Sequence, residues 1–162
     1  MKITFAPKGI LQIDEARIVF RNFSGTPSRY NREGDRNFAV VIPTQEQADA
    51  LLKDGWNVKI RPPRDGDDEP FRYLSVKIKF SNYGGPAAYL ITGNRKNELT
   101  EDTITCLDNV DIESVDLDIR PHNWDRDGDT GRTAYLQAIR VFQKTNRFAT
   151  DPEDIDGEDA PW

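Results

Sequence analysis

The sequence predicts a mainly β protein with one short helix and a disordered acidic tail at its C-terminus. Several stretches alternate apolar and polar residues at period two, which is typical of strands with one buried face. A single stretch, residues 44–55, carries helix-capping signals at both ends. Residues 151–162 hold six carboxylates and no basic side chain, and such a run repels itself and buries little surface.

The first clear strand is followed directly by the helix. Phe38–Ile42 is a short apolar run. Thr44 and Gln47 then fit a capping box, and Gly55 stands where a left-handed C-terminal residue belongs. The apolar stripe between them consists of Ala48, Leu51 and Leu52. We therefore expect a helix of about ten residues, an ordinary length.

Two basic strands are expected next. In Val58–Arg61 the apolar residues alternate with Lys59 and Arg61. Tyr73–Phe80 has the same pattern over a longer stretch. Its expected core side is Leu74, Val76, Ile78 and Phe80, and its expected outer side is Tyr73, Ser75, Lys77 and Lys79. Each strand thus has one apolar face and one face that is exposed and basic.

The last two strands differ from the others. Val110 and Ile112 keep one phase while Val115, Leu117 and Ile119 keep the opposite one, which indicates either a β-bulge near Ser114 or a strand that crosses between layers. Residues 133–142 then form a long strand, after a Gly-rich turn at residues 127–131.

These elements favour a small, strongly curved antiparallel β-barrel of the OB-fold type over a sandwich. Residues 1–150 suit one domain with a modest core, because 36% of the residues are apolar and 31% charged. Residues 151–162 form the tail. No apolar run approaches the ~20 residues that span a bilayer, and the N-terminus lacks a signal-peptide pattern, so we expect a cytoplasmic protein.

The acidity of the chain is confined to its tail. The sequence has 22 basic and 28 acidic side chains. Six of the acidic ones lie in residues 151–162, so the rest of the chain has 22 of each sign. The net charge of −6 therefore does not exclude a nucleic-acid partner for residues 1–150.

Basic side chains mix with aromatic ones in two segments. Residues 17–38 contain Arg17, Arg21, Arg29, Arg32 and Arg36 with Phe20, Phe23, Tyr30 and Phe38. Residues 56–83 contain Lys59, Arg61, Arg64, Arg72, Lys77 and Lys79 with Trp56, Phe71, Tyr73 and Tyr83. This mixture suits single-stranded nucleic acid, because cations follow the phosphates and flat rings stack on unpaired bases.

Some of these aromatic residues must fill the core. We expect Phe20, Phe23 and Phe38 to be buried, because a small β domain needs aromatic filling. Tyr30 lies in a polar loop between arginines, and Tyr73 shares a strand face with lysines. These two rings are the candidates for contact with bases.

No cofactor, metal site or catalytic group is predicted. The aspartates of residues 125–129 are spaced as in a calcium loop, but Thr130 and Leu136 replace its diagnostic Gly and Glu. The single cysteine, Cys106, and the single histidine, His122, cannot make the usual zinc site. We expect a protein that is not an enzyme, although converging carboxylates would leave catalysis open.

The chain resembles phage single-stranded DNA-binding proteins of the OB-fold class. The order of its parts is similar: strand 18–20, a basic and aromatic loop at residues 30–32, strand 38–43, the capped helix and strand 73–80. The ending Asp159-Ala-Pro-Trp162 is similar to the acidic tails of bacterial and phage members, with Trp162 where the bacterial pattern has phenylalanine. The resemblance implies sequence-independent binding of single strands by the barrel, and recruitment of replication or recombination proteins by the tail.

The leading hypothesis is a protein that protects single-stranded DNA during replication, recombination or repair. Its expected DNA-binding residues are Arg29, Tyr30, Arg32, Trp56, Lys59, Arg61, Tyr73, Lys77 and Lys79. The expected partner-binding residues of the tail are Asp156, Glu158, Asp159, Pro161 and Trp162, and the tail is expected to compete with DNA. Two alternatives remain: an interaction or inhibitor protein whose acidic tail mimics DNA, and a metal-dependent nuclease that uses clustered aspartates.

Overall fold

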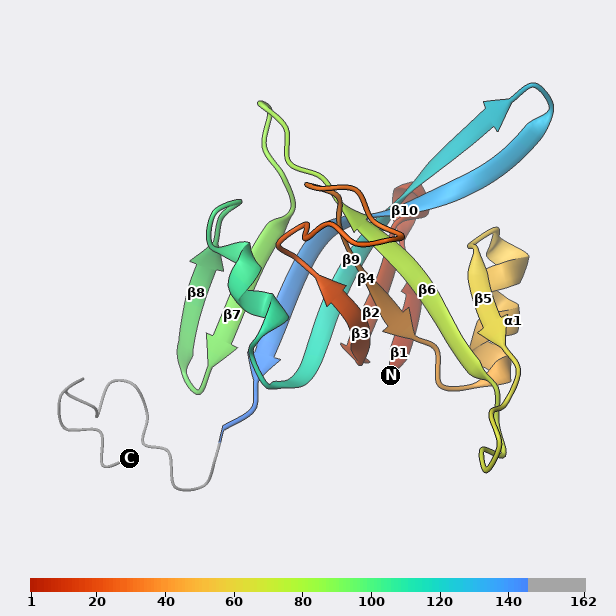
Figure 1. Ribbon diagram of the computed structural model, residues 1–162, viewed down its shortest axis with the longest axis horizontal. Helices are drawn as coiled ribbons and strands as arrows, with labels where there is room; N and C mark the ends of the chain where they lie inside the picture. Colours follow the sequence, from red (N-terminus) through yellow and green to blue (C-terminus); the bar gives the residue numbers. More distant parts are fainter. Residues whose placement is uncertain (146–162) are drawn as a thin grey trace, which may run out of the picture.

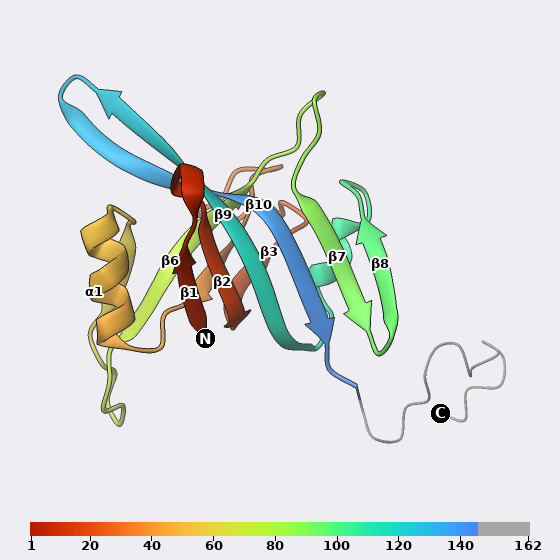
Figure 2. The same ribbon diagram turned by 180° about the vertical axis from the view of Figure 1, so that it is seen from behind.

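The computed structural model describes residues 1–145, which form one twisted sheet with a helix at its side (Figures 1 and 2). The strands of this part of the chain are β1 (Lys2–Phe5), β2 (Leu11–Ala16), β3 (Ile18–Asn22), β4 (Arg36–Val41), β5 (Val58–Arg61), β6 (Phe71–Ile78), β7 (Ala87–Thr92), β8 (Arg95–Leu99), β9 (Ile112–Arg126) and β10 (Asp129–Gln143). The α-helix is α1 (Gln45–Asp54), and 3-10 turns lie at Pro7–Gly9 (η1) and Ile104–Asp108 (η2). The predicted mainly β fold with one short helix is confirmed.

The sheet is curled because the stretch of chain that forms β2 and β3 pairs with two different strands. The hydrogen-bonded order is β1-β2-β9-β10-β6-β4-β3, with β5 on β6, β7 on β10 and β8 on β7. Only Arg17 separates β2, which pairs with β9, from β3, which pairs with β4. The path of strands does not close into a ring, and Arg17 connects β2, near one end of the path, to β3 at the other end. This is the OB-like arrangement that the sequence predicts.

Most strand pairs are antiparallel, but two are parallel. Strand β10 pairs with β6 through Tyr135 and Lys77, and with β7 from Ala138 to Phe142. The contact with β6 fixes the middle of β10 beside the C-terminal half of β6.

β-Bulges lie in four of the strands. Phe142 faces Ser114 and Gln143 faces Ile112, so Glu113 is an extra residue in β9, as the change of phase predicts. In β3, Val19 faces Ala39 and Asn22 faces Asn37. Phe20 and Arg21 of β3 therefore stand opposite the single residue Phe38 of β4. Phe20 has φ +53°. A third shift lies in β2 at Glu15, which has φ +53°. A fourth lies in β10, where Leu136 faces Ile119 and Ala138 faces Asp118. Bulges of this kind increase the local twist and re-aim side chains.

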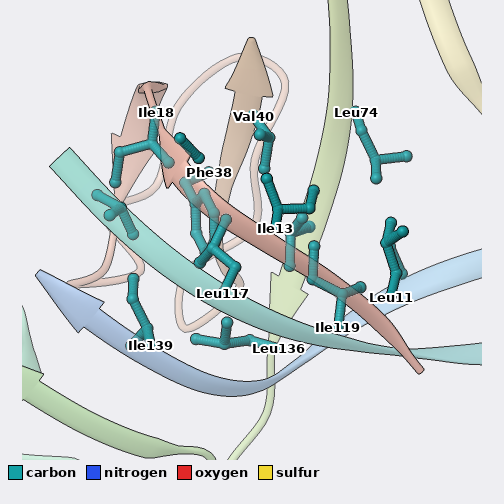
Figure 3. Packing of buried hydrophobic residues seen from close by; sticks show 14 of the residues in the cluster. Leu11, Ile13, Ile18, Phe38, Val40, Leu74, Leu117, Ile119, Leu136 and Ile139 are labelled. Atoms are coloured by element: carbon teal, nitrogen blue, oxygen red, sulfur yellow. The ribbon is translucent and has the colours of Figure 1, made fainter. Parts of the chain in front are cut away.

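The apolar faces of β2, β3, β4, β6, β9 and β10 meet in one core (Figure 3). Phe23 and Phe38 are buried and stack with their ring centroids 5.3 Å apart, which confirms their predicted core role. The prediction for Phe20 is wrong, because its side chain is 56% exposed. The bulge in β3 turns Phe20 away from the core.

Helix α1 has the predicted caps. The Gln47 N–H donates to Thr44 Oγ1 at 3.1 Å, and Gly55 ends the helix with φ +102°. The side-chain amide of Gln47 donates to the Met1 carbonyl at 3.1 Å, which attaches the helix to the N-terminus. No helix within residues 1–145 is long and apolar enough to cross a membrane.

Candidate nucleic-acid interface

The outer face of β4 and β6 is hollowed, with a cavity of about 640 Å³. We call this cavity the β6 hollow. Its polar and charged lining comes from the β3–β4 loop, β4, β5, β6 with the residue after it, and the turn after β8. It includes Tyr30, Asn31, Arg32, Asp35, Arg36, Lys59, Ser75, Lys77, Lys79 and Glu101. Phe20 and Phe80 contribute aromatic rings to its lining. The hollow therefore brings together five of the predicted DNA-binding residues from three separate segments: Tyr30, Arg32, Lys59, Lys77 and Lys79.

The β3–β4 loop is held in shape by Asn31. Its amide nitrogen donates to the carbonyl oxygens of Thr26, Arg32 and Asp35 at 2.9 to 3.1 Å. Its side-chain oxygen accepts a bond from the Asn37 amide at 2.9 Å. Because the polar centre of the loop is satisfied internally, the neighbouring side chains point away from it. Tyr30 is 89% exposed, and the Arg32 side chain is 92% exposed.

Two glycines close the same loop at its base. The Gly34 N–H donates to the Gly25 carbonyl at 2.9 Å. A Cβ atom on Gly25 would lie 2.9 Å from the Gly34 backbone, and Gly25 also has φ +70°. Only glycine fits this close approach without moving the backbone. The loop is therefore a compact structure that displays Tyr30 and Arg32.

Two predicted arginines lie at the exposed rim. The Arg29 guanidinium carbon is 5.6 Å from the centroid of the Tyr30 ring, so cation and ring form one surface unit. The Arg32 guanidinium is 3.4 Å from the Asp35 carboxylate. An exposed pair of this kind contributes little to stability, and Arg32 can exchange it for a phosphate.

An aromatic cluster adjoins the β6 hollow through Phe20. The cluster consists of Phe20, Phe71 and Tyr73, with ring centroids 5.4 to 5.9 Å apart. The Arg61 guanidinium carbon lies 5.8 Å from the Phe20 ring and 5.2 Å from the Tyr73 ring. Arg61 also donates to the Tyr73 hydroxyl at 3.3 Å. We call these three rings the outer aromatic cluster.

Tyr73 has the predicted orientation but little accessible surface. It lies on the face of β6 opposite Leu74, and only 8% of it is exposed. Phe20 and Phe71 pack against its ring. Phe20, which was predicted to lie in the core, is therefore the most exposed ring of the outer aromatic cluster.

The expectation that Trp56 stacks on bases is wrong for this structure. Trp56 is 2% exposed and belongs to the core. Its indole N–H donates to the Asp54 carboxylate at 3.0 Å, and the Arg132 guanidinium carbon lies 4.9 Å from its ring centroid. Trp56 follows Gly55, the C-terminal cap of α1.

A second hollow, of about 770 Å³, lies where the β9–β10 hairpin meets β6. We call it the arm hollow. Arg32, Lys77 and Lys79 line both hollows, so the two are adjacent. The other lining residues are His122, Trp124, Arg126, Asp129, Thr130, Thr133 and Tyr135. None of these residues was predicted to lie at an interface, although Arg120, His122, Trp124 and Arg126 follow one another at period two.

The structure gives no support to a metal site within residues 1–145. This part of the chain has no group of three or more His, Cys, Asp or Glu side chains arranged to hold a metal ion. The aspartates at 125–129 lie around a tight hairpin turn at Asp127 and Gly128. Burial and the nearby Asp108 carboxylate raise the pKa of the Cys106 thiol, which disfavours the nucleophilic thiolate.

The predicted partner-binding residues Asp156, Glu158, Asp159, Pro161 and Trp162 lie outside the described residues.

The comparisons with known proteins agree with a nucleic-acid interface. A family model described as "Putative phage ssDNA-binding domain" matches residues 2–160. A single-stranded DNA-binding protein from bacteriophage Enc34, in complex with ssDNA, has a TM-score of 0.56 at 11% identity, covering 91% of this chain and 93% of that chain. Another structure of the Enc34 protein has a TM-score of 0.52 at 14% identity, covering 95% and 98%. These likenesses show a shared fold. No curated protein matches the chain.

Proposed function

The chain belongs to the family of phage single-stranded DNA-binding domains, and on that premise we propose that it binds single-stranded DNA along the β6 hollow without reading its sequence. The observation that carries this proposal is the convergence of Arg32, Lys59, Lys77 and Lys79 on one hollow whose lining also includes the exposed Phe20 ring. The Enc34 protein, whose fold the chain shares, has a solved structure in complex with ssDNA, which is consistent with the proposal.

The two kinds of side chain have separate roles in this proposal. Lys59, Lys77 and Lys79 are exposed and contact successive phosphates. Phe20 and Tyr30 stack on bases, at about 1 to 3 kcal/mol per base and with little dependence on base identity. Arg61 and Tyr73 pack against the Phe20 ring, and Arg29 packs against the Tyr30 ring. None of these contacts requires a particular base.

A titration of labelled oligonucleotides at several salt concentrations tests the proposal. We expect the affinity to fall as salt rises, because bound phosphates release their counterions. The double variant Lys77→Ala/Lys79→Ala should weaken binding and reduce the slope of log K against log salt by about 0.7 for each lost phosphate contact. Lys53→Ala is the matched control, because Lys53 lies on α1 and lines neither hollow. Preferential, salt-insensitive binding of duplex DNA would refute the proposal.

We also propose that binding is the whole activity of residues 1–150, in the host cytoplasm, during replication, recombination or repair. The acidic tail is proposed to recruit replication or recombination proteins through Asp156, Glu158, Asp159, Pro161 and Trp162, and to compete with DNA for the basic hollow. Incubation of single-stranded DNA with the protein and Mg²⁺ or Mn²⁺ tests the first part. Cleavage that disappears with the purified Lys77→Ala/Lys79→Ala variant would show a nuclease instead.

A further inference from the structure

We propose that the β9–β10 hairpin carries a second base-stacking site, formed by Trp124 lying on Gly131, that lengthens the DNA track beyond the β6 hollow. This inference rests on the proposed function, because it names a further part of the same binding surface. We call residues 120–135 the arm.

The arm is a two-stranded ribbon that projects from the body of the sheet (Figures 1 and 2). Arg126 faces Asp129 across the turn, and the pairing continues without a shift to Arg120 and Tyr135. Asp127 and Gly128 have φ +51° and +91°, the positive values that a tight two-residue hairpin turn requires. The regular pairing gives the arm two defined faces.

One face of the arm carries most of its cations and rings. Side chains two residues apart in a strand share a face, as do directly paired residues. Arg120, His122, Trp124 and Arg126 therefore share a face with Tyr135, the partner of Arg120. His122, Trp124, Arg126 and Tyr135 all line the arm hollow. This face is thus continuous with the basic surface of β6.

The Trp124 indole has a defined position on this face. Its cross-strand partner is Gly131. A Cβ atom on Gly131 would lie 2.3 Å from Cζ2 of the Trp124 ring, so the indole lies directly across the glycine backbone. A glycine within a strand often marks such a close approach. The Trp124 side chain remains 37% exposed, on a ribbon that is too thin to have a core of its own.

Tyr135 connects Trp124 to the β6 hollow. Its ring centroid lies 4.8 Å from the Arg120 guanidinium carbon and 5.5 Å from the Lys79 ammonium. Tyr135 is also the residue of β10 that pairs with Lys77 of β6. A single strand of DNA that contacts Lys77 and Lys79 therefore passes Tyr135 on its way to Trp124.

This arrangement predicts a dependence on oligonucleotide length. A short strand fills only the β6 hollow, and a longer strand also reaches Trp124. The informative lengths run from about 4 to about 16 nucleotides, the range of site sizes known for OB folds. Trp124→Leu should weaken the binding of the longer strands about 5-fold or more and leave the shortest strands unaffected. Trp124→Phe should have a smaller effect, because it keeps a ring.

A second variant tests the position of the Trp124 indole on Gly131 without removing the indole. Gly131→Ala places a methyl group where the indole lies, and Gly131 does not need a left-handed backbone. It should weaken the binding of long strands in the same direction as Trp124→Leu. Tyr89→Leu is the matched control for the loss of an aromatic ring, because Tyr89 lines neither hollow. Circular dichroism and thermal unfolding verify that each variant is folded.

Tryptophan fluorescence gives a direct reading. The chain has three tryptophans, of which Trp56 is buried. In the Trp162→Phe chain, the fluorescence that responds to DNA should come from Trp124 and be quenched only by the longer strands. If Trp124→Leu and Gly131→Ala bind every length as the parent does, while Lys77→Ala/Lys79→Ala weakens every length, the arm site is wrong and the proposed function stands. If the parent binds no single strand of any length, the proposed function itself fails.

Discussion

At the scale of single residues, the backbone of Phe20 decides what its side chain does. A left-handed φ of +53° is unusual for a bulky residue and costs about 1 to 3 kcal/mol. The conformation places an apolar ring in solvent beside Arg61, Phe71 and Tyr73. Alternation along the strand could predict the outward side of Tyr73, but not a one-residue bulge that turns Phe20 outward. Trp56 was misassigned for a related reason: only tertiary packing shows that Arg132 covers it.

Phe20→Ala and Trp56→Ala should therefore have opposite effects. Trp56→Ala removes a buried ring and should lower the free energy of unfolding by about 3 to 5 kcal/mol, with unchanged DNA affinity of the folded protein. Phe20→Ala removes an exposed ring and should reduce DNA affinity by about 1 to 3 kcal/mol with little loss of stability. Urea unfolding and oligonucleotide titration measure the two quantities. Equal destabilisation by both variants would contradict this assignment.

Asp118 gives a prediction for the pH dependence of stability. Burial, with the Asp14 and Asp116 carboxylates nearby, raises the pKa of Asp118 above 3.8, and Arg140 partly opposes this. The folded state therefore holds the proton more tightly than the unfolded state, so stability falls as pH rises between the unfolded and folded pKa values. Asp118→Asn should stabilise the protein at pH 7 by up to about 0.5 kcal/mol, and this gain should vanish below the ordinary pKa.

The matched control is Asp125→Asn, because Asp125 is exposed on the arm. Urea unfolding at pH 7 and at pH 3 measures the difference for both variants. A gain from Asp118→Asn that is equal at the two pH values would show that charge is not its cause.

At the scale of elements, the sequence predicted the helix and the strands that are determined by local interactions. Strand β5 has the predicted bounds Val58–Arg61, and α1 lies between the predicted caps. The bulge in β9 could be predicted because the apolar residues before and after Ser114 alternate in opposite phases. Strands β1, β2, β7 and β8 were not predicted. β8 has no buried face and depends on its pairing with β7, which no local pattern reveals.

Thr44→Ala tests whether the cap stabilises α1 as its geometry indicates. The substitution removes the acceptor for the Gln47 N–H and should lower the free energy of unfolding by about 1 kcal/mol. Thr44→Ser keeps the hydroxyl and should cost much less. Both variants should bind DNA as the parent does, because α1 lines neither hollow. Urea unfolding provides the measurement, and an equal loss for both variants would exclude the capping bond as the cause.

At the scale of the whole molecule, Arg17 links two parts of the sheet. Strand β3 pairs with β4 on one side of this residue, and β2 pairs with β9 on the other. Composition by segment predicted that residues 1–150 could bind DNA. It could not predict that Tyr30, Lys59 and Lys77 meet, because their meeting depends on strand pairing between distant segments.

The separation of charge along the chain gives the last prediction. Residues 151–162 carry all of the net charge of −6, so their removal leaves a chain with a balanced charge and exposed cations around the two hollows. If the tail competes with DNA, its deletion should tighten the binding of single strands at low salt. The gain should shrink as salt rises, because the screening length falls from about 10 Å at 0.1 M to about 3 Å at 1 M.

A chain with the six carboxylates replaced by amides separates charge from Trp162, because it keeps Pro161 and the indole. Charge competition predicts that this chain binds DNA as tightly as the deleted one. If the amide chain binds like the parent and only the deletion tightens binding, the Trp162 ring rather than the charge occupies the hollow. Weaker binding after deletion would mean that the tail supports DNA binding, which contradicts competition in either form.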